Sequence, residues 1–383
     1  MGYFESPAGH VVRTINEAWA FVPDPLPPTL TWTVGLINDL SAADRVLGEL
    51  AGLGRNLVNP NLLIRPFMRR EAVLSSRIEG TQATLTDLYV YEGEQLSLFE
   101  PPPDVQEVHN YVQALEYGLN RLQEFPLSLR LIREIHAHLM EGVRGEEMTP
   151  GEFRRRQNCI GPPGCSLGEA TYVPPPVPHM HEALDAFERF LYDDAGLPPL
   201  VRLGLIHYQF EAIHPFLDGN GRIGRLLLTL LLCAWELLPE PLLYLSAYFE
   251  AHRRAYYEHL LAVSQEGAWE QWLRFFLRGV VEQSRDAMVR ARRLQDLREG
   301  YREQLQVEQT GARLLQVVDL LFDQPLVTVT QVSEVLNVHF ASANHYVQQL
   351  EEAGILREIT GQARNRVYRA GEVLAAIEGG GRG

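Results

Sequence analysis

The stretch HPFLDGNGRIGR, from His214 to Arg225, holds side chains that could perform chemistry on a phosphate. The Gly-Asn-Gly turn at 219–221 would place successive backbone N–H groups at the start of the following helix. Glycines permit the positive φ angles that such an anion-binding turn needs, and the helix N-terminus adds a favourable dipole. Arg222 and Arg225 stand three residues apart, so both side chains could point at the same anion.

Two further side chains complete this group. Asp218 directly precedes the turn, and a lone acid beside bound phosphates usually holds Mg²⁺. His214 ends the preceding helical pattern and can exchange a proton near neutral pH. A base, a metal ligand, an anion-binding turn and two arginines are the parts that transfer from a nucleoside triphosphate requires. The alternative for the turn alone is a polar connection between two helices.

Composition restricts the classes of function. With 383 residues the chain is long enough for two or three domains, and 46% hydrophobic and 22% charged residues indicate a globular protein. A net charge of −15 argues against a nucleic-acid coat protein. The sequence contains no lysine, so a Walker-type phosphate loop is excluded and any phosphate must be held by arginine and backbone N–H groups.

The three cysteines and the apolar segments bear on location. Cys159, Cys165 and Cys233 form a low, odd set that fits a reducing compartment. The first two could face each other across a hairpin, but no full set of metal ligands accompanies them. The N-terminus lacks a signal-peptide pattern, and the apolar run 226–238 is shorter than the about 20 residues that span a bilayer. We therefore expect a cytoplasmic protein without membrane attachment.

The elements around the motif are mainly helical by periodicity. A proline-rich, irregular start leads into an N-terminal helical region, residues 1–105, and a helical core follows over residues 106–280. Within it, residues 151–180 are rich in Gly and Pro and predict short strands with one hairpin. A charged helical connector is expected over 281–310, and a C-terminal domain over 311–373.

At every fixed position HPFLDGNGRIGR matches the signature H-x-F-x-[DE]-G-N-G-R-x-x-R, so the chain resembles the Fic (Fido) family. The resemblance implies a helical core with a β-hairpin flap, and transfer of AMP from ATP to a Ser, Thr or Tyr hydroxyl of a protein. ATP and Mg²⁺ are then the small molecules involved. The partner is a protein substrate, with self-modification and a homodimer as further options.

The resemblance also implies a role for each residue of the motif. His214 would deprotonate the target hydroxyl, Asp218 would hold Mg²⁺, and Phe216 would anchor the loop in the core. The residues that would bind the phosphates of ATP are Gly219, Asn220, Gly221, Arg222 and Arg225.

A second stretch, SSRIEG from Ser75 to Gly80, is similar to the family's inhibitory pattern [ST]-x-x-x-E-[GN]. In that reading a helix over about 64–80 carries Glu79, whose carboxylate pairs with Arg225 and blocks the γ-phosphate by charge and volume. Ser75 and Gly80 occupy the other fixed positions. The alternative is an ordinary helix end that stops at a glycine.

The resemblance to the family also implies where target and base would bind. The flap is expected over residues 158–175, with Tyr172 and Val173 pairing with the target backbone. Tyr256 and Tyr257 could pack against adenine. The alternatives are a structural hairpin and two core tyrosines.

The C-terminal pattern of helix, turn, helix and two short strands is typical of a winged helix. Over residues 326–370, four Arg balance four Glu, and the second helix of the pair contains no Arg. Because phosphate binding needs excess positive charge, the pattern favours target docking or self-association, with DNA binding as the alternative. A nucleotide-sensing DNA-binding regulator therefore stays open beside the transferase, as does removal of AMP or another phosphoryl transfer.

Overall fold

The computed structural model describes residues 6–57, 60–94, 102–143, 148–162, 164–193, 196–307, 311–362 and 364–379. An antiparallel hairpin precedes the helices and consists of β1 (Gly9–Arg13) and β2 (Trp19–Pro23). The expectation of an irregular start was wrong for these residues, because the prolines lie before β1, at Pro7, and from the end of β2 onward, so none interrupts the pairing. The consecutive residues Ala20, Phe21 and Val22 are all buried, so β2 is covered on both faces, and the Phe21 N–H donates to the Val173 carbonyl at 2.9 Å.

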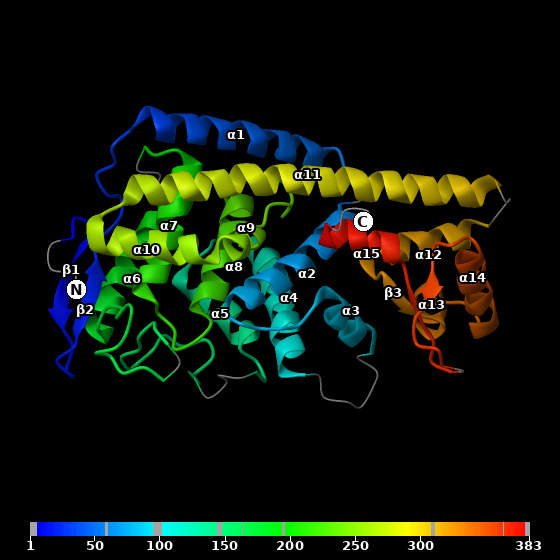
Figure 1. Ribbon diagram of the computed structural model, residues 1–383, viewed down its shortest axis with the longest axis horizontal. Coiled ribbons are helices and arrows are strands. Elements are labelled where there is room, and N and C mark those ends of the chain that lie inside the picture. The colour runs from blue at the N-terminus through cyan, green and yellow to red at the C-terminus, as the bar shows by residue number, and fades with distance from the viewer. Residues whose placement is uncertain are drawn as a thin grey trace.

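Helices form the body of the molecule (Figure 1). They are α1 (Val34–Arg55), α2 (Asn61–Ile78), α3 (Leu85–Glu94), α4 (Pro103–Leu122), α5 (Leu129–Leu139), α6 (Val177–Tyr192), α7 (Pro199–Ile213), α8 (Asn220–Ala234), α9 (Ser246–Ala251), α10 (Arg253–Glu266) and α11 (Trp269–Val307). The helices α7 and α8 are buried on nearly all sides, as their almost unbroken apolar sequences require. They lie at the centre of the fold and position the motif between them.

Helix α11 runs along the length of the molecule, with α1 beside it (Figure 1). The predicted boundary at residue 280 falls inside this helix, so the connector continues directly from the core. Its buried face explains why no break occurs, since Ala287, Ala291, Leu294, Tyr301 and Leu305 stay buried beyond that point. The helical connector is therefore anchored along the fold and is not a free linker.

The C-terminal elements follow α11. They are α12 (Ala312–Asp323), β3 (Leu326–Thr328), α13 (Val329–Leu336), α14 (Phe340–Glu352), β4 (Arg357–Glu358), β5 (Val367–Arg369) and α15 (Gly371–Glu378). The predicted helices and two strands are present, and β3 joins them in a sheet of order β3-β5-β4. Thr328 starts α13 with a capping box to Gln331. The sequence reading missed α15, which packs on α11 and α2.

The C-terminal elements pack on α2, the helix that carries the predicted inhibitory motif. Arg65 and Arg69 of α2 lie 2.7 and 3.1 Å from the Asp323 carboxylate at the end of α12. Arg69 also pairs with Glu92 at 2.6 Å, and both side chains are about nine-tenths buried. One helix thus contacts the C-terminal elements at its start and the motif at its end.

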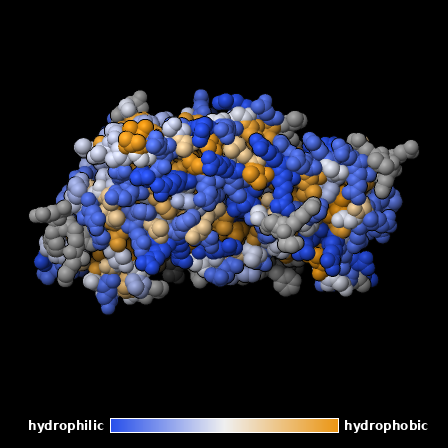
Figure 2. Space-filling view, turned by 45° about the horizontal axis from the view of Figure 1, so that its top comes forward, coloured by the Kyte–Doolittle hydropathy of each residue, from blue (hydrophilic) through white to orange (hydrophobic). Residues whose placement is uncertain are grey.

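The surface carries no continuous apolar face in the view of Figure 2, where hydrophobic residues are scattered among hydrophilic ones. In the part of the chain that the structure describes, no helix is long and apolar enough to cross a membrane. The most apolar predicted segment forms α8, whose side chains fill the core.

Candidate active site

The motif forms the junction between α7 and α8. His214 ends α7 in the left-handed region with φ 49°, a conformation that costs energy for a residue with a side chain. The loop is closed by Asn220, whose side chain accepts from the Phe216 N–H at 2.8 Å and donates to the Phe216 carbonyl at 2.9 Å. The Asn220 side chain therefore holds the loop, and its backbone begins α8.

The two glycines of the turn have different structural roles. Gly219 has φ 75°, and a Cβ there would lie 3.0 Å from the Met140 sulfur. Gly221 lies inside α8, where a Cβ would overlap the Glu79 carboxylate and approach Arg225. Gly219 thus serves the turn, whereas Gly221 keeps space free in front of the helix N-terminus, where an anion is favoured.

His214 is partly buried next to this space. Desolvation, followed by the nearby Arg154 charge, lowers the pKa of His214 to about 4. Arg154 is completely buried and its Nε donates to the His214 carbonyl at 3.0 Å. The imidazole is therefore neutral at physiological pH and able to accept a proton.

His136 and Arg154 are site residues that sequence reasoning missed. The His136 ring stacks on Phe216 at 3.7 Å between ring centroids, with an interplanar angle of 4°. Its Nδ1 accepts from the Gly151 N–H at 2.9 Å, so Nε2 carries the proton and donates to the Asp218 carbonyl at 3.1 Å. Both residues hold the motif by its backbone, and no local pattern in the sequence marks them.

Asp218 and Arg222 are the charged residues on either side of the glycine turn. Arg222 is buried, pairs with Glu107 at 3.3 Å and lies 3.8 Å from the half-exposed Asp218 carboxylate. The residues that the structure describes contain no group of three or more acidic, His or Cys side chains that could hold a metal ion. A cation at Asp218 would therefore need further oxygen ligands, which the phosphates of a nucleotide supply.

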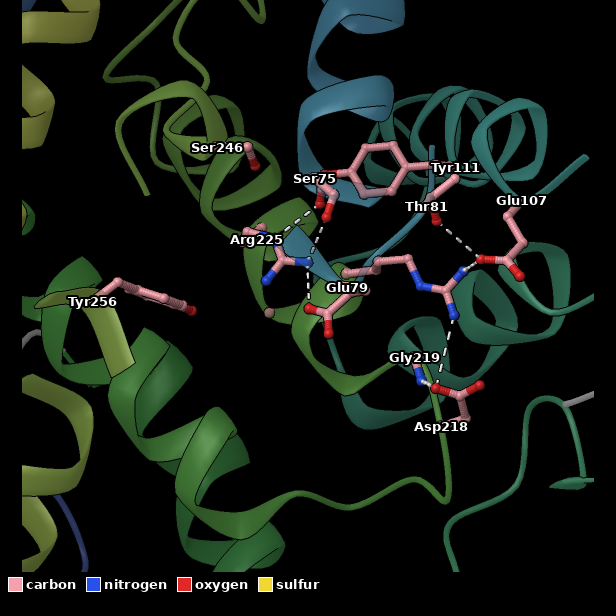
Figure 3. A network of polar contacts seen from close by, with 12 residues as sticks. Ser75, Glu79, Thr81, Glu107, Tyr111, Asp218, Gly219, Arg225, Ser246 and Tyr256 are labelled. Atoms are coloured by element: carbon pink, nitrogen blue, oxygen red, sulfur yellow. Dashed lines mark hydrogen bonds and ion pairs between the residues drawn. The ribbon is translucent and has the colours of Figure 1, made fainter. Parts of the chain in front are cut away.

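Arg225 is held by α2 (Figure 3). Its Nη2 donates to Glu79 at 2.7 Å and to the Ser75 carbonyl at 3.0 Å, and its Nε donates to the Ser75 hydroxyl at 2.8 Å. Although desolvation opposes it, the Arg225 charge lowers the pKa of Glu79, so this carboxylate is ionised. The predicted pairing of Glu79 with Arg225 is present.

Gly80 explains how Glu79 reaches this place. It has φ 104°, and the N–H groups of Gly80 and Thr81 donate to the carbonyls of Arg77 and Ser76, which is a Schellman end of α2. The helix thus stops immediately after Glu79. The glycine that ends α2 therefore also positions Glu79, the residue predicted to inhibit.

A cavity of about 560 Å³ opens beside these residues. His214, Gly221, Arg225 and Glu79 line one part, and the rest is lined by Glu211, Tyr257, Leu260, Leu261 and residues of the expected flap, such as Ile160 and Gly161. Tyr257 lines the cavity, as expected for a base contact. Tyr256 is buried behind it, with its hydroxyl 2.8 Å from His207 Nε2.

The expected flap is a single antiparallel bridge between Ile160 and Tyr172, and Pro163 lies outside the described residues. Tyr172 is buried and its hydroxyl donates to the Ala212 carbonyl at 2.8 Å. The Val173 carbonyl is occupied by the N–H of Phe21. Both residues predicted to pair with the target thus make internal contacts, and Tyr172 also lines the cavity.

The cysteines of the flap lie close together, as the hairpin reading allows. The sulfurs of Cys159 and Cys165 are 3.8 Å apart, and both are free thiols.

Comparison with known proteins agrees with this geometry. The family model described as Fic/DOC family N-terminal matches residues 37–120, and the model described as Fic/DOC family matches residues 126–232. The chain belongs to the Fic family. The second match ends within α8 and includes the whole motif from His214 to Arg225.

Curated relatives carry the name protein adenylyltransferase Fic. Those of Drosophila erecta and Drosophila ananassae are 28% and 29% identical to this Fic chain over 174 residues, 44% of its length. The match covers 32% and 31% of those proteins, so the chain spans about a third of the length of these relatives.

Solved structures agree in fold. A Fic family protein from Desulfovibrio desulfuricans has a TM-score of 0.57 and 20% identity, with 90% of this chain and 98% of that chain covered. A Fic-domain-containing signaling protein from Bacteroides thetaiotaomicron has a TM-score of 0.51 and 19% identity, with 65% and 95% covered. Both likenesses concern the fold of the chain.

Proposed function

We propose that this Fic chain is a self-inhibited protein adenylyltransferase, which transfers AMP from ATP to a Ser, Thr or Tyr hydroxyl of a protein target or of itself. The observation that carries the proposal is the arrangement of Arg225. It lies one turn into α8, beside the glycine turn and His214, and its donors are taken up by Glu79 and Ser75. A guanidinium in an anion site that is covered by a carboxylate supports both phosphate binding and its inhibition.

In this proposal His214 is the general base. Neutral imidazole accepts the proton of the target hydroxyl, whose oxygen forms a bond to the α-phosphorus. The bond from that phosphorus to the bridging oxygen breaks, and pyrophosphate leaves. The backbone N–H groups at Gly219, Asn220 and Gly221, together with Arg222 and Arg225, stabilise the charge on the phosphates. Asp218 would hold Mg²⁺, which neutralises phosphate charge when bound.

Glu79 supplies the inhibition in this proposal. Its carboxylate touches the space above Gly221 and occupies a donor of Arg225, so an outer phosphate meets both a negative charge and a filled volume. Displacing Glu79 would free the guanidinium fork for the γ-phosphate. The same ionised carboxylate beside His214 also suits activation of a water, which keeps AMP removal as the second candidate activity.

The C-terminal residues 311–373 are assigned, on their order of helices and strands, as a winged helix joined to the Fic core of residues 106–280 by the end of α11. Its balanced charge supports docking of a protein partner or a homodimer over binding of DNA. A DNA-binding regulator with a nucleotide-sensing core predicts specific duplex binding that weakens steeply with salt and survives His214→Ala.

Labelled ATP tests the proposal. Wild type, Glu79→Gly and His214→Ala are incubated with Mg²⁺ and ATP that carries label on the α-phosphate or on the γ-phosphate. Strong α-label on the Glu79→Gly protein, little on wild type and none on His214→Ala is the expected result. Label from the γ-phosphate alone would indicate a kinase-like reaction, and release of AMP from a labelled target by wild type would indicate removal.

A further inference from the structure

Glu211 is a carboxylate of the cavity that neither the motif nor the inhibition uses. Helix α7 carries it one turn before His214, and it is partly exposed toward the cavity that it lines. Its Oε1 is buried and has no hydrogen-bond partner among the described residues. A buried acceptor without a donor costs about 1–3 kcal/mol, so we asked which donor would complete it.

Arg225 is the nearest candidate within the protein, but its contacts are directed elsewhere. Its Nε and Nη2 donate to Ser75 and Glu79, and the ion pairs of the described residues do not include one between Arg225 and Glu211. Gly224 provides the room for the carboxyl, because a Cβ there would overlap Glu211 Oε1. The glycine on α8 thus makes room for the Glu211 carboxyl, but no described residue donates a hydrogen bond to its Oε1.

The lining of the cavity indicates the missing donor. It combines Gly221, Arg225 and His214, the groups suited to phosphates, with Tyr257, Leu260 and Leu261, which suit an apolar ring. The Glu211 charge acts on both groups, because it affects the pKa of Arg225 and the pKa of Tyr257. In a nucleoside triphosphate, the group between phosphates and base is the ribose.

Ribose hydroxyls are donors that match this acceptor. A carboxylate has acceptor sites only, and an acidic side chain that accepts from ribose hydroxyls is a recurrent solution in nucleotide sites. Desolvation raises the pKa of Glu211 to about 7 in the unliganded protein, and a hydroxyl donor would favour the ionised form.

We propose that Glu211 accepts a hydrogen bond from a ribose hydroxyl of the bound nucleotide and thereby selects ribonucleotides over deoxyribonucleotides. The proposal rests on nucleotide binding in this cavity, as set out above. Glu211 would be a specificity residue, since it contacts the substrate away from the reacting atoms.

The test compares Glu79→Gly with the double variants Glu79→Gly/Glu211→Ala and Glu79→Gly/Glu211→Gln. For each, the Kd of ATP, 2′-deoxy-ATP and 3′-deoxy-ATP is measured by calorimetry with Mg²⁺, and kcat and KM are measured from α-labelled nucleotide. We expect Glu79→Gly to prefer ATP over one deoxy form by roughly tenfold or more, the equivalent of one hydrogen bond to a charged group. The deoxy form that binds more weakly than ATP shows which ribose hydroxyl, 2′ or 3′, donates to Glu211.

The two Glu211 variants separate recognition from a structural role. The alanine variant should bring the ratio of the Kd values for the deoxy form and for ATP close to one, with the change in activity mainly in KM. The glutamine variant keeps one acceptor and should retain part of the preference for ATP. An unchanged preference in the alanine variant, or an equal loss of affinity for ATP and both deoxy forms, would overturn the proposal and assign Glu211 to support of Arg225. Thermal unfolding of each variant verifies that the fold persists.

Failure of the proposed function has a different signature. If Glu79→Gly binds ATP without transferring AMP, the ratio of Kd values still decides the role of Glu211. If Glu79→Gly and wild type bind none of the three nucleotides, both the transferase and the ribose contact are wrong.

Discussion

Glu79 and Arg225 are 146 residues apart in the sequence and 2.7 Å apart in the structure, where they join the end of α2 to the second turn of α8. Arg225 is buried, whereas the Glu79 side chain is 37% exposed toward the cavity. The arginine is therefore fixed and the carboxylate is the partner that can move. If Glu79 inhibits as proposed, relief requires displacement of one exposed side chain and no unpacking of α8.

The charge and the volume of the Glu79 side chain could each contribute to the proposed inhibition, and two substitutions separate the contributions. Glu79→Gly removes both, whereas Glu79→Gln removes the charge and keeps nearly the same volume. We expect AMP incorporation to rise in the order wild type, Glu79→Gln, Glu79→Gly, with roughly a tenfold or larger rise for glycine. Addition of His214→Ala to each variant is the control and should abolish the signal. Equal activity of wild type and Glu79→Gly would contradict inhibition by Glu79.

The proton affinity of His214 provides a second prediction. Desolvation and Arg154 lower its pKa to about 4, so the imidazole is neutral and competent as a base throughout the physiological range. In NMR titration of ¹³C-labelled histidine, the resonance that disappears in His214→Gln should show no inflection between about pH 5.5 and 8. Glu79→Gly should lower this pKa further, because a nearby carboxylate stabilises the imidazolium. A midpoint close to 6.5 would show that water reaches the ring freely.

The ion pair between Arg69 and Glu92 should contribute strongly to stability. Both side chains are about nine-tenths buried, and Glu92→Ala would leave the arginine with Asp323 alone. Breaking a buried pair in this way costs about 3 kcal/mol or more, which urea unfolding monitored by circular dichroism can measure. Glu124→Ala is the matched control, since Glu124 is 67% exposed in its pair with Arg121 and its loss should cost less than about 1 kcal/mol. Equal costs for the two variants would refute a special role of burial.

The motif residues could be placed from the sequence because they are contiguous and their types fix a local geometry. Glycines at 219 and 221 require a turn and an open helix start, and α8 begins within this stretch, at Asn220. The ion pair of Glu79 with Arg225 was predictable only through resemblance to a family, since no local rule links α2 to α8. The same limit explains why His136 and Arg154 were missed, because they act through backbone atoms of a distant loop.

Tyr256 and Tyr257 illustrate the limit at the level of one residue. Neighbouring positions on a helix point about 100° apart, so only one of two adjacent tyrosines can face the cavity, and the sequence does not say which. The structure buries Tyr256 against His207 and places Tyr257 in the cavity wall. The hairpin of β1 and β2 was missed although its strands pair with each other, since β2 is buried on both faces and lacks the alternation that marks a strand with one face in water.

Glu71 of α2 yields a prediction on stability and pH. Its carboxyl is buried, accepts from Ser246 and Tyr111, and has its pKa raised to about 7 by desolvation. The unfolded chain releases this proton near pH 4.5, whereas the folded protein keeps it until about pH 7. Between these values the folded state binds more protons, so its stability falls as pH rises, by about 3 kcal/mol over the window.

Glu71→Gln should remove this part of the pH dependence. The free energy of unfolding, measured in urea at about pH 5 and about pH 8, should change less between the two pH values in the variant than in wild type, by up to about 3 kcal/mol. Any constant offset reports the altered hydrogen bonds to Ser246 and does not affect the comparison. Glu49→Gln, at an exposed position of α1, should leave the wild-type pH dependence intact. If Glu71→Gln and Glu49→Gln behave alike, Glu71 is ionised in the folded protein at neutral pH, and Ser246 and Arg225 compensate its charge fully.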